Sequence, residues 1–282
     1  MTPSNIDIYN HFVQSCGLPI RVSALAAREQ LYQNLIKSAP NTLNRFGKKV
    51  FSQNDEDGLT LEFCKRIFDR PGLFIEFGIG NGLENNTLIL LANQWSGGWI
   101  GNEALAFPLT GTTSTRLGYQ TGWVTLENCL ELAGASLPPS TSILDIDLLS
   151  IDLDGNDIHI LRRLCGSGVR PSLIIVEYNA KFPPPIQFEI KYEDSHTWAK
   201  DDYMGASLTS FVISMQSFGY KIVCCNLTGS NAYFVRDDLF HLFPEAPRNI
   251  DDIYREPLYE LSFMFSRGHP TSIKTVVKLI SG

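Results

Sequence analysis

The sequence has neither an extended basic run nor a long apolar one. Lys and Arg number 23 and Asp and Glu number 30, so the net charge is −7 over 282 residues. This acidic balance argues against a protein that grips nucleic acid through a broad phosphate-binding surface. No stretch approaches the ~20 consecutive apolar residues of a membrane helix. We therefore expect no nucleic-acid partner and no insertion into a membrane.

Cysteine pairs at metal-ligand spacing are also missing. The six cysteines are scattered along the chain, and none makes a C-x-x-C motif. This scatter excludes a zinc finger and a small disulfide framework. Residues 1–17 lack the basic start and apolar block of a secretory signal. The simplest expectation is a cytoplasmic protein with free thiols.

The sequence does have the composition of a folded α/β protein. Hydrophobic residues make up 44% and charged residues 19%, which is ordinary for a globular chain. Helix formers over 24–36 predict a helix, and a second helix is expected over 59–68. Short apolar runs then alternate with helix-length segments, which indicates βαβ units and a mostly parallel sheet. The runs are 73–77, 99–102, 148–151 and 173–176, with helices expected at 86–94, 108–117 and 156–165.

The region 207–236 breaks this alternation. An amphipathic helix is expected over 208–218. The runs 221–226 and 231–236 follow, separated by only Leu-Thr-Gly-Ser. So short a connection makes a hairpin, which a purely parallel sheet cannot contain. We therefore predict one antiparallel strand at the far side of the sheet.

Four of the apolar runs have an acid at or just after their end. These acids are Glu76, Glu103, Asp152 and Glu177. In a parallel sheet all four lie at the carboxyl edge, where open α/β folds bind ligands. Helix capping explains one or two of them. Burying all four is costly unless a ligand compensates.

The first run continues into a glycine-rich turn, Glu76-Phe-Gly78-Ile-Gly80-Asn-Gly82. Glycines at alternate positions let the backbone pass close to a ligand, although a plain tight turn explains them equally well. A dinucleotide fingerprint needs G-x-G-x-x-G, and Leu83 stands where its last glycine belongs. The pattern suits S-adenosylmethionine better than NAD.

A cofactor site follows from this turn and its neighbours. The acid before the glycines can meet the cationic amino-acid end of S-adenosylmethionine. Glu103, about 20 residues on, lies where an acid holds ribose hydroxyls. The residues expected to bind the cofactor are Glu76, Gly78, Gly80, Gly82, Asn86, Thr87, Glu103 and Asp152.

A more specific resemblance is carried by Ile-Asp-Leu-Asp-Gly-Asn-Asp at 151–157 and Arg-Pro-Ser-Leu-Ile-Ile-Val-Glu-Tyr-Asn at 170–179. Together with Ser-Gln-Asn-Asp-Glu-Asp at 52–57, these segments resemble the FkbM-like family of S-adenosylmethionine-dependent O-methyltransferases. The resemblance covers roughly residues 51–238. Relatives often have Lys in place of Ser150 and Asp in place of Glu76.

This resemblance implies a fold, a division of the chain and an activity. The fold is a Rossmann-like class I methyltransferase with a mostly parallel seven-stranded sheet and one antiparallel strand. The activity is methyl transfer to a hydroxyl of a glycan or natural product, in polysaccharide or secondary-metabolite biosynthesis. The expected parts are an N-terminal helical extension (1–50), a catalytic domain (51–240) with a substrate-loop insertion (180–206), and a C-terminal tail packed on the domain (241–282).

Two chemical routes fit the residues. In the first, a divalent cation such as Mg²⁺ binds Asp152, Glu177 and Asn179, as the resemblance to metal-dependent methyltransferases implies, with Asp154 or Asp157 as further oxygen donors. In the second, no metal is used, and a side chain acts as general base. The catalytic candidates are Asp152, Asp154, Asp157 and His196; His159 is disfavoured because it lies inside an expected helix.

The acceptor side is expected to use the long connection at 180–206, because long connections at this edge often carry function. Small-molecule and glycan acceptors fit it, and Tyr and Trp can stack on a sugar ring. Gln53 and Glu56 are expected at the same mouth, or as the start of the following helix. The candidates for substrate contact are Gln53, Glu56, Lys181, Tyr192, Trp198 and Tyr203.

Other functions stay open at this point. An NAD-dependent oxidoreductase is disfavoured by Leu83. A non-catalytic binding protein of the same fold is disfavoured by the four strand-end acids. A nucleic-acid methyltransferase is weaker still, since there is no basic patch and no pocket motif for a flipped base. The sequence does not choose between a monomer and a homo-oligomer.

Overall fold

The computed structural model describes residues 5–107, 116–265 and 269–281. The chain divides into two compact units, residues 1–39 and 40–282. The first unit is one helix, α1 (Asn5–Ser38), with side-chain hydrogen bonds one turn apart, such as Gln30 Nε2 to Asn34 Oδ1 at 2.8 Å. Within the described residues, no helix has both the length and the apolar character needed to cross a membrane.

The division between the units falls before residue 40 and not at residue 50. Residues 41–46 belong to the larger unit because they are bonded to its sheet. Asn41 Nδ2 donates to the Val223 carbonyl at 2.8 Å, and Asn44 Nδ2 donates to the Cys225 carbonyl at 2.7 Å. Leu43 is fully buried between them. These contacts fix the short helix η1 (Thr42–Phe46) in the core.

The larger unit is built on one seven-stranded sheet with the order β3-β2-β1-β4-β5-β7-β6. Strand β7 runs antiparallel to both of its neighbours, and the other described pairings are parallel. The predicted mixed sheet with one antiparallel strand is therefore confirmed. The strands are β1 (Leu73–Phe77), β2 (Ser96–Gly101), β3 (Leu117–Thr121), β4 (Leu148–Ile151), β5 (Leu173–Glu177), β6 (Tyr220–Cys225) and β7 (Asn231–Arg236).

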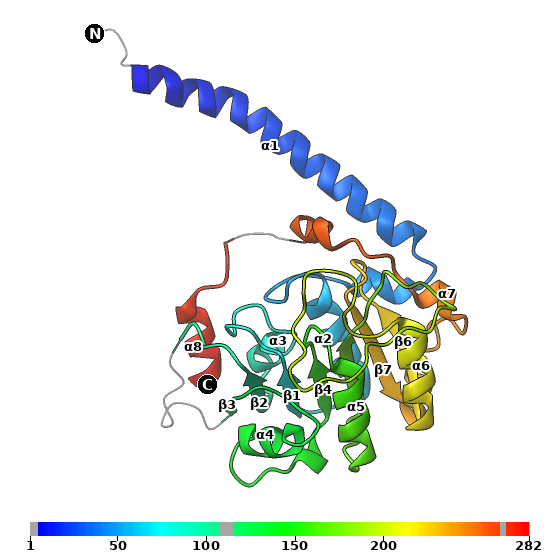
Figure 1. Ribbon diagram of the computed structural model, residues 1–282. Coiled ribbons are helices and arrows are strands. Elements are labelled where there is room, and N and C mark those ends of the chain that lie inside the picture. The colour runs from blue at the N-terminus through cyan, green and yellow to red at the C-terminus, as the bar shows by residue number, and fades with distance from the viewer. Residues whose placement is uncertain (1–4, 108–115, 266–268, 282) are drawn as a thin grey trace. The chain divides into compact units, whose positions relative to one another are not determined.

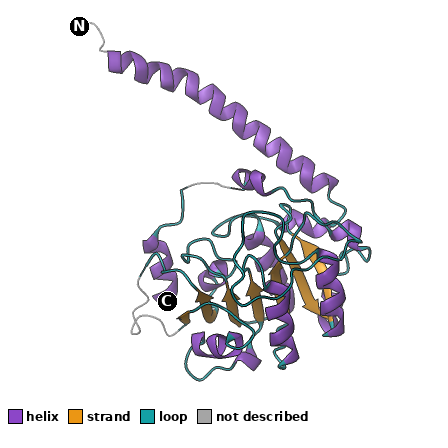
Figure 2. Ribbon diagram, viewed as in Figure 1, coloured by secondary structure: helices purple, strands orange, loops and turns teal. Residues whose placement is uncertain are grey.

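Helices cover both faces of this sheet (Figures 1 and 2). One hydrophobic cluster joins the sheet to α2 (Glu56–Ile67), α3 (Leu88–Ala92) and α8 (Ile273–Ser281). The other joins it to α4 (Cys129–Ser136), α5 (Asp157–Gly166) and α6 (Leu208–Ser217). The remaining short helices are η2 (Ile143–Asp145), η3 (Asp237–Leu242), α7 (Ile250–Ile253) and η4 (Tyr259–Met264).

Coverage on both faces explains the continuous apolar strands. Along β1, Phe74 packs into one cluster while Ile75 and Phe77 pack into the other. Every residue of β1 is buried. A strand covered on both faces needs no alternation of polar and apolar residues. The burial of β1 therefore leaves functional groups only at its end.

Two further expectations concern the helix at 108–117 and the cysteines. Of the helix expected at 108–117, residues 108–115 lie outside the described residues, and Leu117 begins strand β3. The five cysteines whose side chains are described are free and buried. Burial raises the pKa of the Cys165 thiol to about 11, so this cysteine stays protonated and packs as a small apolar residue.

Candidate functional site

A cavity of about 570 Å³ lies at the carboxyl edge of the sheet. Its volume is within the range of small-molecule sites. The ends of β1, β2, β4 and β5 meet there with the start of β7. Residues that line it include Gln53, Glu56, Glu76, Gly78, Gly80, Asn81, Asn85, Asn86, Glu103, Trp123, Asp152, Asp154, Asn156, Glu177, His196, Thr197, Trp198, Ser230 and Asn231.

Glu76 is held in place by the chain just before α3. Its Oε1 accepts the backbone N–H of Asn86 at 2.9 Å, and its Oε2 accepts the backbone N–H of Thr87 at 3.0 Å. The Thr87 hydroxyl also donates to Oε2 and accepts the Trp99 indole N–H at 2.9 Å. Burial raises the pKa of Glu76 to about 7, although these hydrogen bonds oppose the rise. Glu76 thus ties the start of α3 to β1.

The three glycines of the turn have different tasks. All have a positive φ: +83° at Gly78, +51° at Gly80 and +83° at Gly82. A Cβ on Gly78 would lie 1.4 Å from the Asp152 carbonyl oxygen, so the approach of β4 demands this glycine. A Cβ on Gly80 would meet nothing within 4 Å, so Gly80 presents bare backbone to the cavity. Gly82 packs against Leu105 and is not among the lining residues.

The far side of this end of the cavity carries Glu103 and Asn85. Glu103 is exposed and lines the cavity beyond the end of β2. Asn85 is only 4% exposed, yet neither Nδ2 nor Oδ1 has a hydrogen-bond partner among the described residues. A buried amide without partners costs free energy unless a ligand completes it. Asn85, which lines the cavity, is therefore a candidate for contact with a ligand.

Three carboxyl groups meet at the ends of β4 and β5. Asp152, Asp154 and Glu177 each place an oxygen within 4.8 Å of the others. Burial raises the pKa of Asp152 and of Glu177 well above the usual value, and mutual repulsion among the acids adds to it. Partial desolvation also raises the pKa of Asp154, although this residue is the exposed member of the three. Such a group takes up a proton or a cation more readily than an isolated carboxylate does.

Asp157 and Asn179, which the sequence placed with these acids, are engaged elsewhere. Asp157 is fully buried, and its two oxygens accept the N–H groups of Leu153 and Gly155 at 2.8 and 2.9 Å. It stabilises the turn that begins α5. The Asn179 amide donates to the carbonyls of Asp202 and Met204, both at 2.9 Å. Neither is among the residues that line the cavity.

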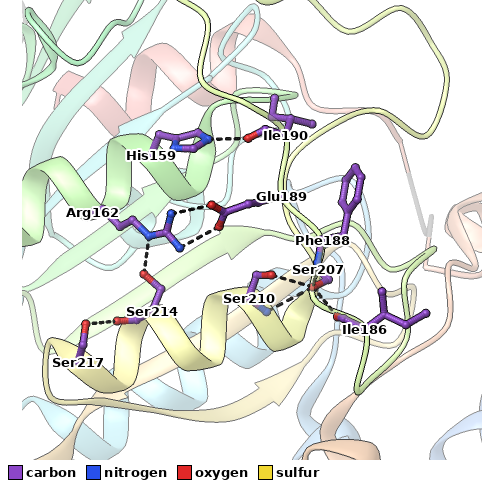
Figure 3. A network of polar contacts seen from close by, with 10 residues as sticks. All are labelled: His159, Arg162, Ile186, Phe188, Glu189, Ile190, Ser207, Ser210, Ser214 and Ser217. Carbon is purple, nitrogen blue, oxygen red and sulfur yellow. Dashed lines mark hydrogen bonds and ion pairs between the residues drawn. The ribbon is translucent and has the colours of Figure 1, made fainter.

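The connection between β5 and α6 is attached to the helices on that face (Figure 3). Arg162 of α5 pairs with Glu189 at 2.8 Å and donates through Nε to Ser214 of α6 at 2.8 Å. The His159 ring contacts the Ile190 carbonyl at 2.8 Å. Ser207 caps α6, and its hydroxyl donates to the Ile186 carbonyl at 2.8 Å. The part of the connection near the helices is therefore fixed.

His196 lies on this connection and reaches the cavity. A Cβ on Gly155 would lie 2.3 Å from its Cδ2 and 2.8 Å from its Nε2, so the imidazole rests on the bare backbone beside Asp154. Its Nε2 is buried, and no described residue gives it a hydrogen-bond partner. The ring nitrogen is thus available for a ligand or for proton transfer.

The predicted substrate residues separate into two sets. Gln53, Glu56 and Trp198 line the cavity. Glu56 is 1% exposed and accepts from the Asn226 amide at 2.7 Å, which ties α2 to the β6–β7 turn. The others make contacts away from the cavity: Lys181 pairs with Asp202, Tyr192 accepts the Leu126 N–H at 2.8 Å, and Tyr203 accepts the Lys191 N–H at 3.3 Å.

Sequence reasoning missed several lining residues, chiefly Asn85, Trp123, Asn156 and Asn231. Asn231 begins β7, and an antiparallel strand begins at the edge where parallel strands end. That rule alone was sufficient to find it. Trp123 follows β3, and the sequence of this strand contains no apolar run that would have predicted it.

Comparisons with known proteins give limited similarity. No protein family model matches the chain, and no curated protein matches it. The cofactor-bound structure of Rv0187 from MTB aligns with 84% of this chain and 99% of its own, at 13% identity and a TM-score of 0.33. The glycopeptide N-methyltransferase MtfA aligns over 65% of this chain and 91% of its own (13% identity, TM-score 0.35). An O-methyltransferase family protein from Burkholderia thailandensis aligns over 75% of this chain and 70% of its own, at 11% identity and a TM-score of 0.35.

The strand order defines the class of fold. A seven-stranded sheet ordered 3-2-1-4-5-7-6, with only β7 reversed among the described strands, is the class I methyltransferase fold. With TM-scores below 0.5, the alignments above add nothing to this assignment. The FkbM-like resemblance stays a prediction.

Proposed function

We propose that this protein is an S-adenosylmethionine-dependent methyltransferase that methylates a hydroxyl of a glycan or secondary metabolite. One observation carries the proposal: a single cavity joins a glycine-rich turn and two strand-end acids to a second group of acids and a histidine. The first set suits a cofactor with an amino acid and a ribose. The second suits an acceptor that must lose a proton.

The cofactor half is assigned to residues at the ends of β1 and β2. Gly80 offers open backbone, Glu103 offers a carboxylate to ribose hydroxyls, and Asn85 offers a buried amide with no other partner. S-adenosylmethionine supplies the methyl group: the acceptor oxygen bonds to the methyl carbon, the carbon–sulfur pair stays on sulfur, and the hydroxyl proton leaves. Asp152, at the next strand end, separates the two halves.

The acceptor half is assigned to Asp154, Glu177 and His196. His196 Nε2 has no partner in the described structure and lies beside Asp154. It is our choice for the group that removes the hydroxyl proton. Asp154 and Glu177 then hold the acceptor in line with the methyl group, since orientation accounts for much of such catalysis.

A metal-assisted route remains the second candidate. The oxygens of Asp152, Asp154 and Glu177 lie within 4.8 Å of one another, a donor set that Mg²⁺ accepts. A bound divalent cation would lower the pKa of the acceptor hydroxyl and orient it. Asn179 is unsuited to this set, because both ends of its amide already have partners.

Ligand-dependent thermal unfolding tests the cofactor. S-adenosylmethionine or S-adenosylhomocysteine at ~100 times its Kd is expected to add about 2.7 kcal/mol, which raises the midpoint by roughly 5 °C. Glu103→Gln is expected to reduce this shift. Glu131→Gln removes a charge from an exposed position of α4 and serves as the matched control.

The outcomes separate the candidate functions. A shift with NAD and none with S-adenosylhomocysteine contradicts the proposal and favours an oxidoreductase. No shift with any of them, in folded protein freed of carried-over cofactor, favours a binding protein. A further shift with magnesium that is lost in Asp152→Asn supports the metal route.

The role of His196 is tested through Gly155. In Gly155→Ala the new methyl group displaces the imidazole, whose Cδ2 lies 2.3 Å from the added Cβ. We expect methyl transfer to slow by about a hundredfold, as in His196→Gln, while S-adenosylhomocysteine binds unchanged. The His196 ring signals in NMR spectra report the displacement.

Gly166→Ala is the control, because a Cβ there meets nothing within 4 Å. If Gly155→Ala shifts the His196 signals and leaves the rate intact, His196 is not the base.

A further inference from the structure

The acceptor half of the cavity is lined by acids that no basic side chain in its described walls balances. Seven lining residues are acidic, and no described lining residue is Lys or Arg. Glu84 has Lys49 Nζ at 3.9 Å, and Glu56 and Glu76 are held by neutral donors. The acids at the ends of β4 and β5 have no ion pair with any described residue; they are Asp152, Asp154 and Glu177.

The inference rests on the proposed function, so the charge of the methyl donor must be counted. S-adenosylmethionine has a sulfonium, an ammonium and a carboxylate, hence one net positive charge. Glu76 and Glu103 already lie on its side of the cavity. The acids of the acceptor half therefore stay in excess after the cofactor binds.

Buried oxygen atoms beside these acids also lack donors. Asn156 is 6% exposed and Asn231 is 5% exposed. Their amide nitrogens donate to the Glu193 carbonyl at 2.9 Å and to Glu56 at 3.3 Å, but neither Oδ1 atom has a partner in the described parts of the chain. Asn231 is the register partner of Glu177, whose Oε2 is likewise unpartnered.

The unpartnered atoms of this wall are side-chain oxygens of Asn156, Asn231 and Glu177. Oxygens that accept hydrogen bonds favour a ligand that brings donors. A hydroxyl brings an acceptor oxygen with each donor, whereas an ammonium brings three donors and no acceptor. A buried carboxylate is best compensated by a charged partner. A ligand group rich in donors and positive in charge matches this wall.

Two indole rings at the same cavity point to an organic cation. Trp123 and Trp198 both line it and are 42% and 43% exposed. Their N–H groups are used by the carbonyls of Asp194 and Asp201. The ring faces remain for contact, and tryptophan is the side chain that attracts cations most strongly through its ring.

We propose that the acceptor carries a protonated amine, which Asp154, Glu177 and the oxygens of Asn156 and Asn231 hold while the indole rings cover it. An amino sugar has this chemistry: an ammonium for recognition beside hydroxyls for methylation. We expect acceptors with a phosphate or carboxylate at this position to bind more weakly than the amine, because the acids repel them.

Calorimetric titration of the full chain loaded with S-adenosylhomocysteine tests the proposal. The probes form matched sets: glucosamine, N-acetylglucosamine and glucuronic acid, and putrescine with 1,4-butanediol. EDTA is present, so that no divalent cation occupies the acids. Each amine is expected to bind about tenfold tighter than its neutral counterpart, and more weakly at higher ionic strength.

Variants locate the binding. Asp154→Asn removes the charge but tolerates the positive φ of 53° at this position, and it is expected to abolish most of the amine preference. Glu193→Gln removes an exposed charge outside the lining residues and is the control. Trp198→Leu is expected to weaken the amines, and Trp198→Phe to restore part of the loss.

Equal or tighter binding of the neutral probes overturns the proposal, as does the absence of binding by every amine while S-adenosylhomocysteine binds. An amine preference that Asp154→Asn leaves intact overturns it too. Failure of the proposed function gives a different result. In that case S-adenosylhomocysteine itself does not bind, whether or not the amines bind.

Discussion

Gly78→Ala is expected to unfold at a far lower temperature than the natural protein. The added Cβ would lie 1.4 Å from the Asp152 carbonyl oxygen, and the backbone has φ +83°. Overpacking costs about 1–3 kcal/mol and a left-handed backbone about as much again. Since β1 and β4 are central strands joined by the Asp152 N–H to the Phe77 carbonyl at 3.0 Å, the clash cannot relax at an edge. The midpoint should fall by roughly 10 °C.

Gly80→Ala is the matched control two residues away. Its Cβ meets nothing within 4 Å, so only the backbone at φ +51° opposes the change, at about 1–2 kcal/mol. If Gly80 faces the cofactor as proposed, this variant loses affinity for S-adenosylhomocysteine while staying folded. Gly78→Ala melting within a few degrees of the natural protein would contradict the close approach of β1 and β4.

The second large effect expected is a loss of stability with rising pH. Burial raises the pKa of Asp57 to about 6, of Glu76 to about 7 and of Asp55 to about 8. Hydrogen bonds oppose the rise in each case. The neighbouring Glu56 adds to the rise at Asp55 and Asp57. Each group holds its proton more tightly in the folded chain than in the unfolded one. The stabilisation is therefore complete below about pH 4, and it is lost as pH rises through about 6 to 8. Calorimetric unfolding at several pH values measures this decline.

Asp55→Asn tests the origin of the decline. Asp55 is fully buried; its Oδ2 accepts the Leu227 N–H at 3.1 Å and its Oδ1 has no partner. Asparagine keeps the accepting oxygen and removes the charge, so the variant is expected to unfold at a higher temperature at pH 8 and to show a flatter curve. Asp202→Asn, an exposed partner of Lys181 with a lowered pKa, should leave the slope unchanged. If the unfolding temperatures of Asp55→Asn and of the natural protein decline in parallel with rising pH, the charge on Asp55 does not cause the decline.

The strands were largely predictable because burial on both faces leaves a clear apolar run. The expected runs 73–77, 148–151 and 231–236 coincide with β1, β4 and β7. Strand β3 was missed because its sequence, Leu-Gly-Tyr-Gln-Thr, has one fully buried residue. An edge strand such as β3 needs no apolar run, since it pairs with one strand instead of two.

The candidate site was predictable where it follows from topology and not where it depends on contacts. Strand ends placed Glu76, Asp152 and Glu177 at one edge. Sequence could not separate Asp154 from Asp157, three residues apart: one carboxylate faces the cavity and the other accepts two backbone N–H groups. That division depends on the turn geometry, in which Asp154 adopts φ 53°.

The connection between β5 and α6 also bears on how this protein can change. The Ile190 N–H donates to the Gly205 carbonyl at 3.1 Å, and Glu189 bridges to Ala206. Residues 191–204 thus form a loop that lies outside the sheet and its helices. The two ends of this loop are held together by backbone contacts. The length and sequence of such a closed loop can vary without disturbing the strands, provided that His196 and the two carbonyls that hold Asn179 keep their places. Both natural divergence and deliberate grafting should therefore retune acceptor choice there while leaving the cofactor half untouched.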